Sequence, residues 1–120
     1  MDNKEFAKLL ENRTKNFAIS VIKLSSSLSN TSENKVIKNQ ITKSGTSIGA
    51  NYIEANRSRS DKDFLNKIQI CESEASETVY WLELLMSLSK NTTKETKLVF
   101  KEANELLAIF TSIRNSLKKK

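Results

Sequence analysis

The stretch SGTSIGANYIEANRSRSDKDF, residues 44–64, contains both glycines of the 120-residue chain, Gly45 and Gly49. Glycines four residues apart lie on one face of a helix and allow another backbone to approach closely. In an apolar segment this spacing would indicate a membrane helix dimer, and before Gly-Lys-Ser/Thr it would indicate a phosphate-binding loop. The surrounding residues are polar, and no such lysine follows. The stretch therefore predicts close packing between two helices of a bundle.

The composition favours long helices along the whole chain. Proline is absent and glycine is scarce, and these are the residues that interrupt helices most strongly. A chain of 120 residues suits one domain with one core. With no histidine and a single cysteine, the chain cannot form a Ser-His-Asp or Cys-His catalytic centre, an imidazole metal site or an internal disulfide. Cys71 falls within a hydrophobic stripe, which predicts a buried, unreactive thiol.

The first residues, MDNKEFAKLL, lack the basic and apolar regions of a signal peptide. No apolar run approaches the roughly 20 residues that a membrane span needs. We therefore expect a reduced, cytoplasmic protein with no membrane partner.

Hydrophobic residues recur every three or four positions in four segments, as amphipathic helices require. The expected helices cover residues 3–29, 31–55, 61–89 and 93–117. Side chains that accept a hydrogen bond from the first helical turn are expected to cap the last three of these helices, at Asn30, Ser60 and Thr92. Short connections between long helices predict an all-α, antiparallel, up-down-up-down four-helix bundle that forms a single domain, residues 1–120.

Four polar residues occupy stripe positions, Arg13, Asn51, Glu74 and Glu77, and Glu54 is a further carboxylate of the second segment. Inward carboxylates could bind a di-iron centre, but such centres need Glu-x-x-His motifs and the chain has no histidine. Acid–base catalysis by the glutamates is a second alternative. We favour a buried structural network in which Arg13 pairs with the glutamates, and breaking such a network costs about 3–5 kcal/mol.

The third segment, residues 61–89, carries a second hydrophobic stripe beside its core stripe. This second stripe includes Ile70, Trp81, Leu84 and Leu88. One small bundle covers only one side of a helix, so an additional stripe indicates contact with another molecule. We expect a homo-oligomer with these residues in its interface.

The net charge of +6 suits an acidic partner such as nucleic acid. Residues 1–60 carry ten basic and five acidic residues, whereas residues 61–120 carry ten and nine. The candidate phosphate-binding residues lie in the second turn and at the C-terminus: Arg57, Arg59, Lys62, Lys118, Lys119 and Lys120. Surface basic residues are more often solubilising, but repeated around a ring they would form a basic rim that binds phosphates.

Two segments resemble a known family: TSIGANYIEA, residues 46–55, and KDFLNKIQICESEASETVYWLELL, residues 62–85. They are similar to the signatures of the 23S rRNA intervening-sequence proteins, first noticed as reading frames within bacterial large-subunit rRNA genes. The resemblance implies an antiparallel four-helix bundle, assembly into pentameric rings and no defined molecular function. A related branch, the accessory variability determinants of diversity-generating retroelements, forms basic pentameric barrels that bind a reverse transcriptase and nucleic acid.

From these observations we expect a non-enzymatic, homo-oligomeric scaffold or adaptor without a cofactor. Its expected partners are other copies of itself and RNA, DNA or a nucleic-acid-processing protein. The alternative is a protein–protein interaction module with no nucleic-acid role. An enzyme that uses Glu54, Glu74 and Glu77 is a third hypothesis.

Overall fold

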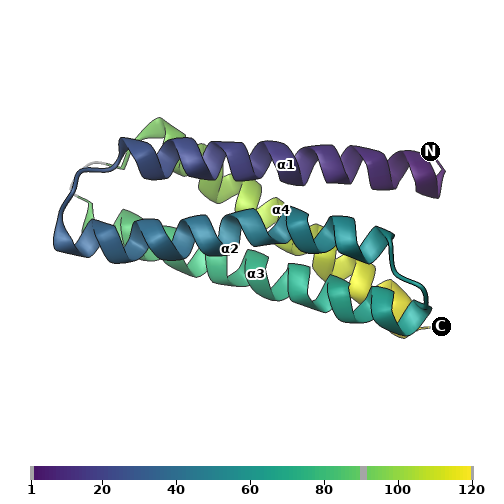
Figure 1. Cartoon of the computed structure of the whole chain (residues 1–120). Helices are drawn as coiled ribbons and strands as arrows, with labels where there is room; N and C mark the ends of the chain where they lie inside the picture. Colours follow the sequence, from purple (N-terminus) through teal and green to yellow (C-terminus); the bar gives the residue numbers. More distant parts are fainter. Residues whose placement is uncertain (1, 90–91, 120) are drawn as a thin grey trace.

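The computed structural model describes residues 2–89 and 92–119. The described residues form four long helices: α1 (Asn3–Ser27), α2 (Ser32–Asn56), α3 (Asp61–Leu88) and α4 (Lys94–Lys118). Successive helices run in opposite directions and form a narrow bundle of about 46 × 22 × 20 Å (Figure 1). This arrangement confirms the predicted all-α four-helix bundle, and each helix begins and ends within two residues of its expected range.

The helices pack mainly on their neighbours in the sequence. Helix α2 lies between α1 and α3, and α4 packs along α3 and over a shorter length on α1. Figure 1 shows why the last contact is short: α4 crosses the bundle obliquely, so that its C-terminal end lies beside the start of α3 and away from α1. Consequently α1 depends largely on α2 for its packing.

Each helix begins at a residue whose side-chain oxygen accepts a hydrogen bond from the backbone N–H three residues later. These caps are Asp2, Thr31, Ser60 and Thr93. The cap predicted at Ser60 is confirmed. The caps predicted at Asn30 and Thr92 are each wrong by one residue, because the following threonine has the extended backbone that a capping hydroxyl needs.

The core is a continuous cluster of aliphatic and aromatic side chains from all four helices. The cluster includes an edge-to-face pair, Tyr52 and Phe110, whose ring centroids are 5.5 Å apart. Cys71 is buried in the same cluster, and its thiol contacts the carbonyl oxygen of Ile48 at 3.5 Å. Burial raises the pKa of Cys71 to about 12, so the thiol stays protonated, as an unreactive core cysteine should.

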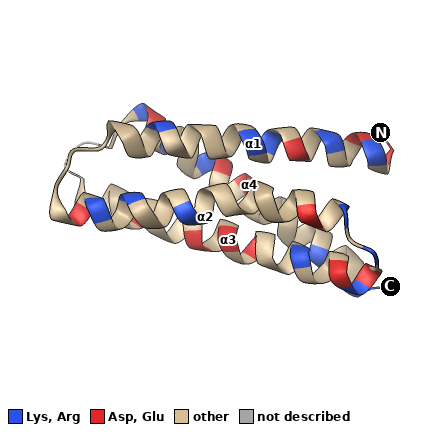
Figure 2. Ribbon diagram, viewed as in Figure 1, with Lys and Arg blue, Asp and Glu red and all other residues tan. Residues whose placement is uncertain are grey.

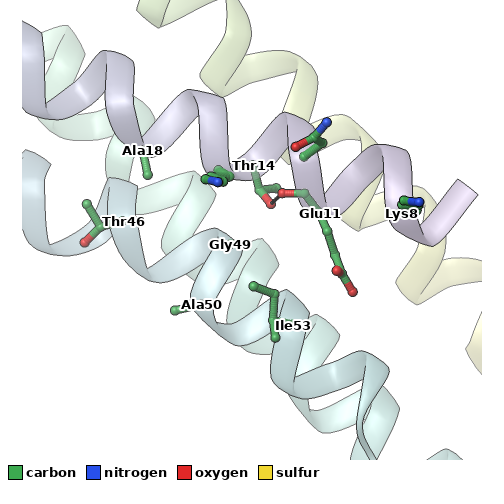
Figure 3. A pocket seen from close by; sticks show the side chains of 10 residues that line it. Lys8, Glu11, Thr14, Ala18, Thr46, Gly49, Ala50 and Ile53 are labelled. Atoms are coloured by element: carbon green, nitrogen blue, oxygen red, sulfur yellow. Dashed lines mark hydrogen bonds between the residues drawn. The ribbon is translucent and has the colours of Figure 1, made fainter.

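The two glycines of α2 face α1, as their spacing predicted. A Cβ atom at Gly45 would lie 2.9 Å from Cγ2 of Val21, and one at Gly49 would lie 3.1 Å from Cβ of Thr14. Figure 3 shows Thr14 directly across from Gly49 at the point where the two helices meet. The glycines therefore permit a helix-to-helix approach that larger residues would prevent.

Candidate nucleic-acid interface

The antiparallel fold gathers the predicted basic residues at one end of the bundle. The α2–α3 turn and the C-terminus lie together there, and the N-terminus of α1 lies at the same end (Figure 1). The described candidates are all exposed: Arg57, Arg59, Lys62, Lys118 and Lys119. Lys120, the sixth predicted residue, lies outside the described residues. We call the five described residues the basic end; Figure 2 shows basic segments at this turn and near the C-terminus.

The α2–α3 turn is short because backbone hydrogen bonds close it directly after α2. The N–H of Arg57 donates to the carbonyl of Glu54 at 3.1 Å, and the N–H of Ser58 donates to that of Ala55 at 3.0 Å. Ser60 then caps α3. The turn is therefore anchored at both ends, which positions the exposed Arg57 and Arg59 between two rigid helices.

A shallow depression of about 530 Å³ lies beside this turn, with lining residues that carry both signs of charge. The basic ones are Arg57, Arg59 and Lys67, and the acidic ones are Glu54 and Asp63. Nζ of Lys67 lies 3.5 Å from Oε2 of Glu54, so this lysine is already paired. Phosphates would therefore bind the two arginines more readily than the centre of the depression.

Close to this end, α3 and α4 are joined by an ion pair that the sequence analysis missed. Arg114 donates from Nε to Oε1 of Glu72 at 2.6 Å, and Thr111 donates from its hydroxyl to Oε2 at 2.7 Å. The hydrogen bond from Arg114 lowers the pKa of Glu72 below its ordinary value. Arg114 is therefore engaged in fixing α4 on α3.

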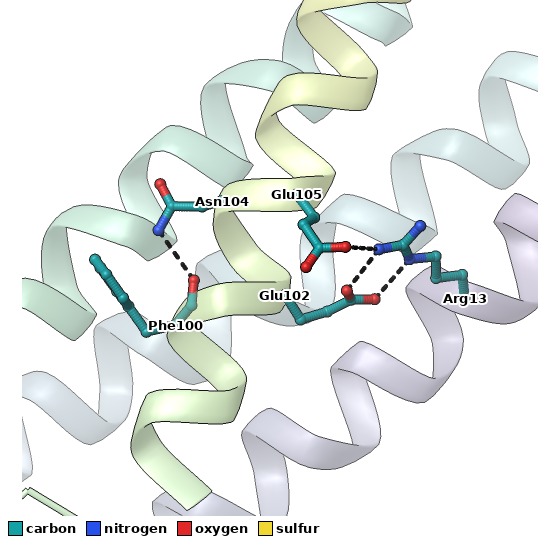
Figure 4. Close-up of polar contacts among 5 residues, drawn as sticks. All are labelled: Arg13, Phe100, Glu102, Asn104 and Glu105. Carbon is teal, nitrogen blue, oxygen red and sulfur yellow. Dashed lines mark hydrogen bonds and ion pairs between the residues drawn. The ribbon is translucent and has the colours of Figure 1, made fainter. Parts of the chain in front are cut away.

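The predicted network around Arg13 is wrong. Arg13 instead contacts two carboxylates of α4, donating to both oxygens of Glu102 at 2.7 Å and to Glu105 at 2.8 Å (Figure 4). The hydrogen bond to Glu102 raises the pKa of Arg13 above its ordinary value. The side chain of Arg13 is 37% exposed, so the cluster lies at the surface and not in the core.

The other predicted network residues do not meet Arg13. The amide of Asn51 donates to the carbonyl of Ser47, Glu54 pairs with Lys67, and Glu77 accepts from the indole of Trp81. The physical reason is rotational: Arg13 lies on the side of α1 that faces α4, whereas the predicted partners belong to α2 and α3. Among the residues that the structure describes, no group of three or more acidic or cysteine side chains could bind a metal ion.

The polar groups that the core does bury are hydroxyls. Thr78 donates to Ser44 at 2.8 Å between α3 and α2, and Thr14 donates to the carbonyl of Leu10 at 2.9 Å. Both Ser44 and Thr78 fall on the hydrophobic stripes of the sequence. A small hydroxyl at a stripe position was therefore the better signal of a buried polar contact, because it can be satisfied without burying charge.

The second stripe of α3 remains at the surface of a single copy. Of this stripe, Ile70 and Leu88 are 41% and 59% exposed, and Trp81 and Leu84 are partly buried; Tyr80, beside the stripe, is 55% exposed. The rings of Tyr80 and Trp81 form an edge-to-face pair with centroids 5.2 Å apart. Assembly through this surface stays a prediction. None of the described helices is sufficiently long and apolar to cross a membrane.

The fold and this site define an antiparallel four-helix-bundle protein with a basic end. A family model described as 23S rRNA-intervening sequence protein matches residues 9–112, so the chain belongs to this family. This confirms the family named from residues 46–55 and 62–85.

Among solved structures, the chain is similar to a protein of unknown function from the S23 ribosomal protein family of Bacteroides thetaiotaomicron. The two are 35% identical, with a TM-score of 0.82 over 91% of this chain and 97% of that one. A comparison with curated proteins gave no match.

Proposed function

We propose that the protein is a non-enzymatic, homo-oligomeric scaffold that binds RNA through its basic end. The observation that carries this proposal is the meeting of the α2–α3 turn and the C-terminus at one end of the bundle. Residues far apart in the sequence, Arg57, Arg59, Lys62, Lys118 and Lys119, thereby contribute to one exposed region, and these cations outnumber the two aspartates of the first turn of α3, Asp61 and Asp63. Such a region binds the phosphate backbone of a polyanion.

The proposed contact recognises the phosphate backbone and not particular bases. Sequence-tolerant binding of single strands usually combines cations with aromatic side chains on which bases stack. Two described aromatic side chains are exposed, Phe6 near the start of α1 and Tyr80 in the second half of α3, and neither belongs to the α2–α3 turn or the C-terminal segment that supply the cations. The basic end therefore offers phosphate contacts, which position an RNA without reading its sequence.

Assembly would strengthen this weak site. One copy presents five described cations, and a ring would repeat them, so that one RNA could contact several copies at a high effective concentration. We assign the interface to Ile70, Trp81, Leu84 and Leu88, and the family resemblance favours a pentamer. The related branch of the family binds a reverse transcriptase, which suggests a nucleic-acid-processing protein as a further partner.

Salt-dependent RNA binding tests the proposal. For the wild type, affinity for a single-stranded RNA should fall steeply between 50 and 200 mM salt, as counterion release requires. The double variant Arg57→Ala/Arg59→Ala should bind more weakly, and its slope of log affinity against log salt should be shallower by roughly 1.4.

The matched control is Lys97→Ala/Lys101→Ala, which removes the same charge from exposed positions near the other end of the bundle. It should retain nearly the wild-type slope. Equal losses in both double variants would show that only net charge matters. Affinity that is indifferent to salt would remove the RNA-binding part of the proposal.

A protein–protein interaction module is the second candidate, and the depression beside the α2–α3 turn favours it. Glu54 and Asp63 line this depression together with the arginines, and mixed charge suits a protein surface better than a polyanion. Co-purification of one stoichiometric protein, with no nucleic acid in the absorbance spectrum, would support this candidate over RNA binding.

A further inference from the structure

Two exposed surfaces of the bundle are apolar but differ in shape. The first, which we call the α3 ridge, consists of large side chains on the outer side of α3: Ile70, Tyr80, Trp81, Leu84 and Leu88. The second, which we call the α1–α2 groove, is a hollow of about 430 Å³ between α1 and α2 (Figure 3). Its lining is largely small or aliphatic: Thr14, Ala18, Thr46, Gly49, Ala50 and Ile53.

The groove exists because the residues along this edge of the α1–α2 contact are small. Gly49 has no side chain, and Ala18 and Ala50 provide one methyl group each, so little fills the space outside the point where the helices meet. The ridge has the opposite character, because its members include an indole, a phenol and three branched aliphatic chains. Large side chains on one surface and a hollow on another are complementary in shape.

The charges around the two surfaces are also complementary. The part of α3 from Ile68 to Leu88 contains no lysine or arginine and four glutamates, of which Glu72 is already paired with Arg114 of α4. Glu77 lies midway between Ile70 and Leu84 at heptad spacing, so it shares the face of the ridge. Figure 2 shows this acidic segment in the middle of α3.

The groove is bordered mainly by lysines. Lys8 and Lys15, seven residues apart on α1, both line it, and Lys43 precedes Ala50 by seven residues on the outer face of α2. The one carboxylate among the lining residues, Glu11, accepts a hydrogen bond from the amide of Asn56 at 2.8 Å. Lys8, Lys15 and Lys43 outnumber this carboxylate, so the border of the groove carries a net positive charge where the ridge is negative.

We infer that the α3 ridge of one copy docks into the α1–α2 groove of the next copy. This inference rests on the oligomeric part of the proposed function and names the surface that the ridge contacts. A symmetric contact of two ridges would bring the glutamates of both copies together, and a contact of two grooves would bring lysines together. The ridge-to-groove contact is the pairing that opposes unlike charges.

The geometry of such a contact has a consequence for assembly. Because the two surfaces differ, each added copy leaves one ridge and one groove available, and all are satisfied only when a ring closes. A variant with a blocked ridge retains a working groove, and a variant with a blocked groove retains a working ridge. Mixing the two variants should therefore produce one contact and stop at a heterodimer.

This mixing experiment tests the inference. The ridge variant is Ile70→Arg/Tyr80→Arg and the groove variant is Ala50→Glu/Ile53→Glu, all at exposed positions. Light scattering should give a mass above that of a dimer for the wild type, the mass of a monomer for each variant alone, and a 1:1 dimer for the mixture. Leu98→Arg, at an exposed apolar position of α4, is the control and should assemble like the wild type.

The outcomes separate the possible arrangements. If the groove variant assembles alone as the wild type does, the ridge pairs with something other than the groove and the inference is overturned. A mixture that stays monomeric while the wild type assembles overturns it as well. A wild type that is monomeric at every concentration contradicts both this inference and the proposed oligomer, whereas RNA binding by the basic end is measured separately.

A cross-linking experiment keeps the inference testable if the charged variants fail to fold. Cys71 is buried with a raised pKa, so a maleimide should react only with an introduced cysteine. Ile70→Cys and Ile53→Cys should each give little cross-linked dimer alone with a short bis-maleimide. If the two variants are dissociated, mixed and allowed to reassemble, the cross-linker should join Ile70→Cys of one copy to Ile53→Cys of another and give a heterodimer. Efficient linkage of Ile70→Cys to itself would instead indicate a ridge-to-ridge contact and overturn the inference.

Discussion

Helix α1 contacts its two neighbours in different ways. Towards α2 it packs against two glycines, Gly45 and Gly49, at distances that leave no space for a methyl group without movement. Towards α4 it makes a polar contact through Arg13, a partly exposed side chain that binds the carboxylates of Glu102 and Glu105. The first contact depends on shape and the second on charge.

The difference predicts how each contact responds to change. A close-packed contact cannot accommodate added volume, because neighbouring atoms already occupy the space. An exposed ion pair can be lost at little cost, because water replaces the missing partner. The position of α1 should therefore depend strongly on the glycines and only moderately on Arg13.

Gly45→Leu should have the largest effect on stability. Its Cβ would lie 2.9 Å from Cγ2 of Val21, a fully buried and branched side chain that cannot move away easily. Leucine is a better helix former by roughly 1 kcal/mol, but overpacking of this extent should outweigh that gain and cost about 3 kcal/mol overall. Urea unfolding at fixed protein concentration measures the loss.

The control for this substitution is Asn39→Leu, at an exposed position of the same helix. It adds a leucine without meeting α1 and should change the free energy of unfolding by no more than about 0.5 kcal/mol. If both variants unfold at the same urea concentration, the α1–α2 contact does not depend on close approach at Gly45.

The glycine contact could be predicted from the sequence, whereas the charged one could not. Both glycines of the chain, at helical spacing in polar surroundings, already indicated a close helix neighbour. Glu102 and Glu105 have the pattern of ordinary surface residues, because whether they contact Arg13 depends on how α4 crosses α1. That crossing is a tertiary property, and periodicity within one helix does not contain it.

The same limit applies to the candidate site. An up-down-up-down order places the second turn, with Arg57, and the C-terminal segment, with Lys118, at one end, since antiparallel helices bring alternate connections together. The pairing of Lys67 with Glu54 and of Arg114 with Glu72 depends on helix rotation, which determines which cations remain available to phosphate. Sequence reasoning therefore named the cations of the basic end without showing that two neighbouring cations are already paired.

Arg13→Met tests the charged side of the comparison and should have an intermediate effect. It removes the bonds to Glu102 and Glu105, but these groups are partly exposed, so the loss should be about 1 kcal/mol after solvent screening. This is well below the 3–5 kcal/mol of a buried network. The loss should shrink at high salt, as a surface ion pair requires.

A double-mutant cycle identifies the partners of Arg13. Arg13→Met combined with Glu102→Gln should show coupling, because either change alone already breaks the ion pair. Arg13→Met combined with Glu77→Leu should be additive within about 0.5 kcal/mol, since Glu77 contacts Trp81 and not Arg13. Strong coupling with Glu77 would restore the network that the sequence suggested.

The smallest effect is expected from Glu72→Gln, and its signature is a dependence on pH. Arg114 lowers the pKa of Glu72, so the unfolded state takes up a proton at a higher pH than the folded state does. The stabilisation is therefore complete above the ordinary glutamate pKa of about 4.3 and is lost as the pH falls through the lower folded value. Because the amide can still accept a hydrogen bond, the loss at pH 7 should be only about 0.5 kcal/mol.

Measuring the loss of unfolding free energy for Glu72→Gln and for Gly45→Leu at two pH values separates a contact that depends on charge from one that depends on shape. The difference between wild type and Glu72→Gln should shrink from pH 7 to pH 3.5, because acid protonates the wild-type carboxylate too. The loss caused by Gly45→Leu should stay nearly constant over the same range, since the contact with Val21 involves no charge. A constant difference for Glu72→Gln would mean that its carboxylate contributes no charge-dependent stability to the α3–α4 contact.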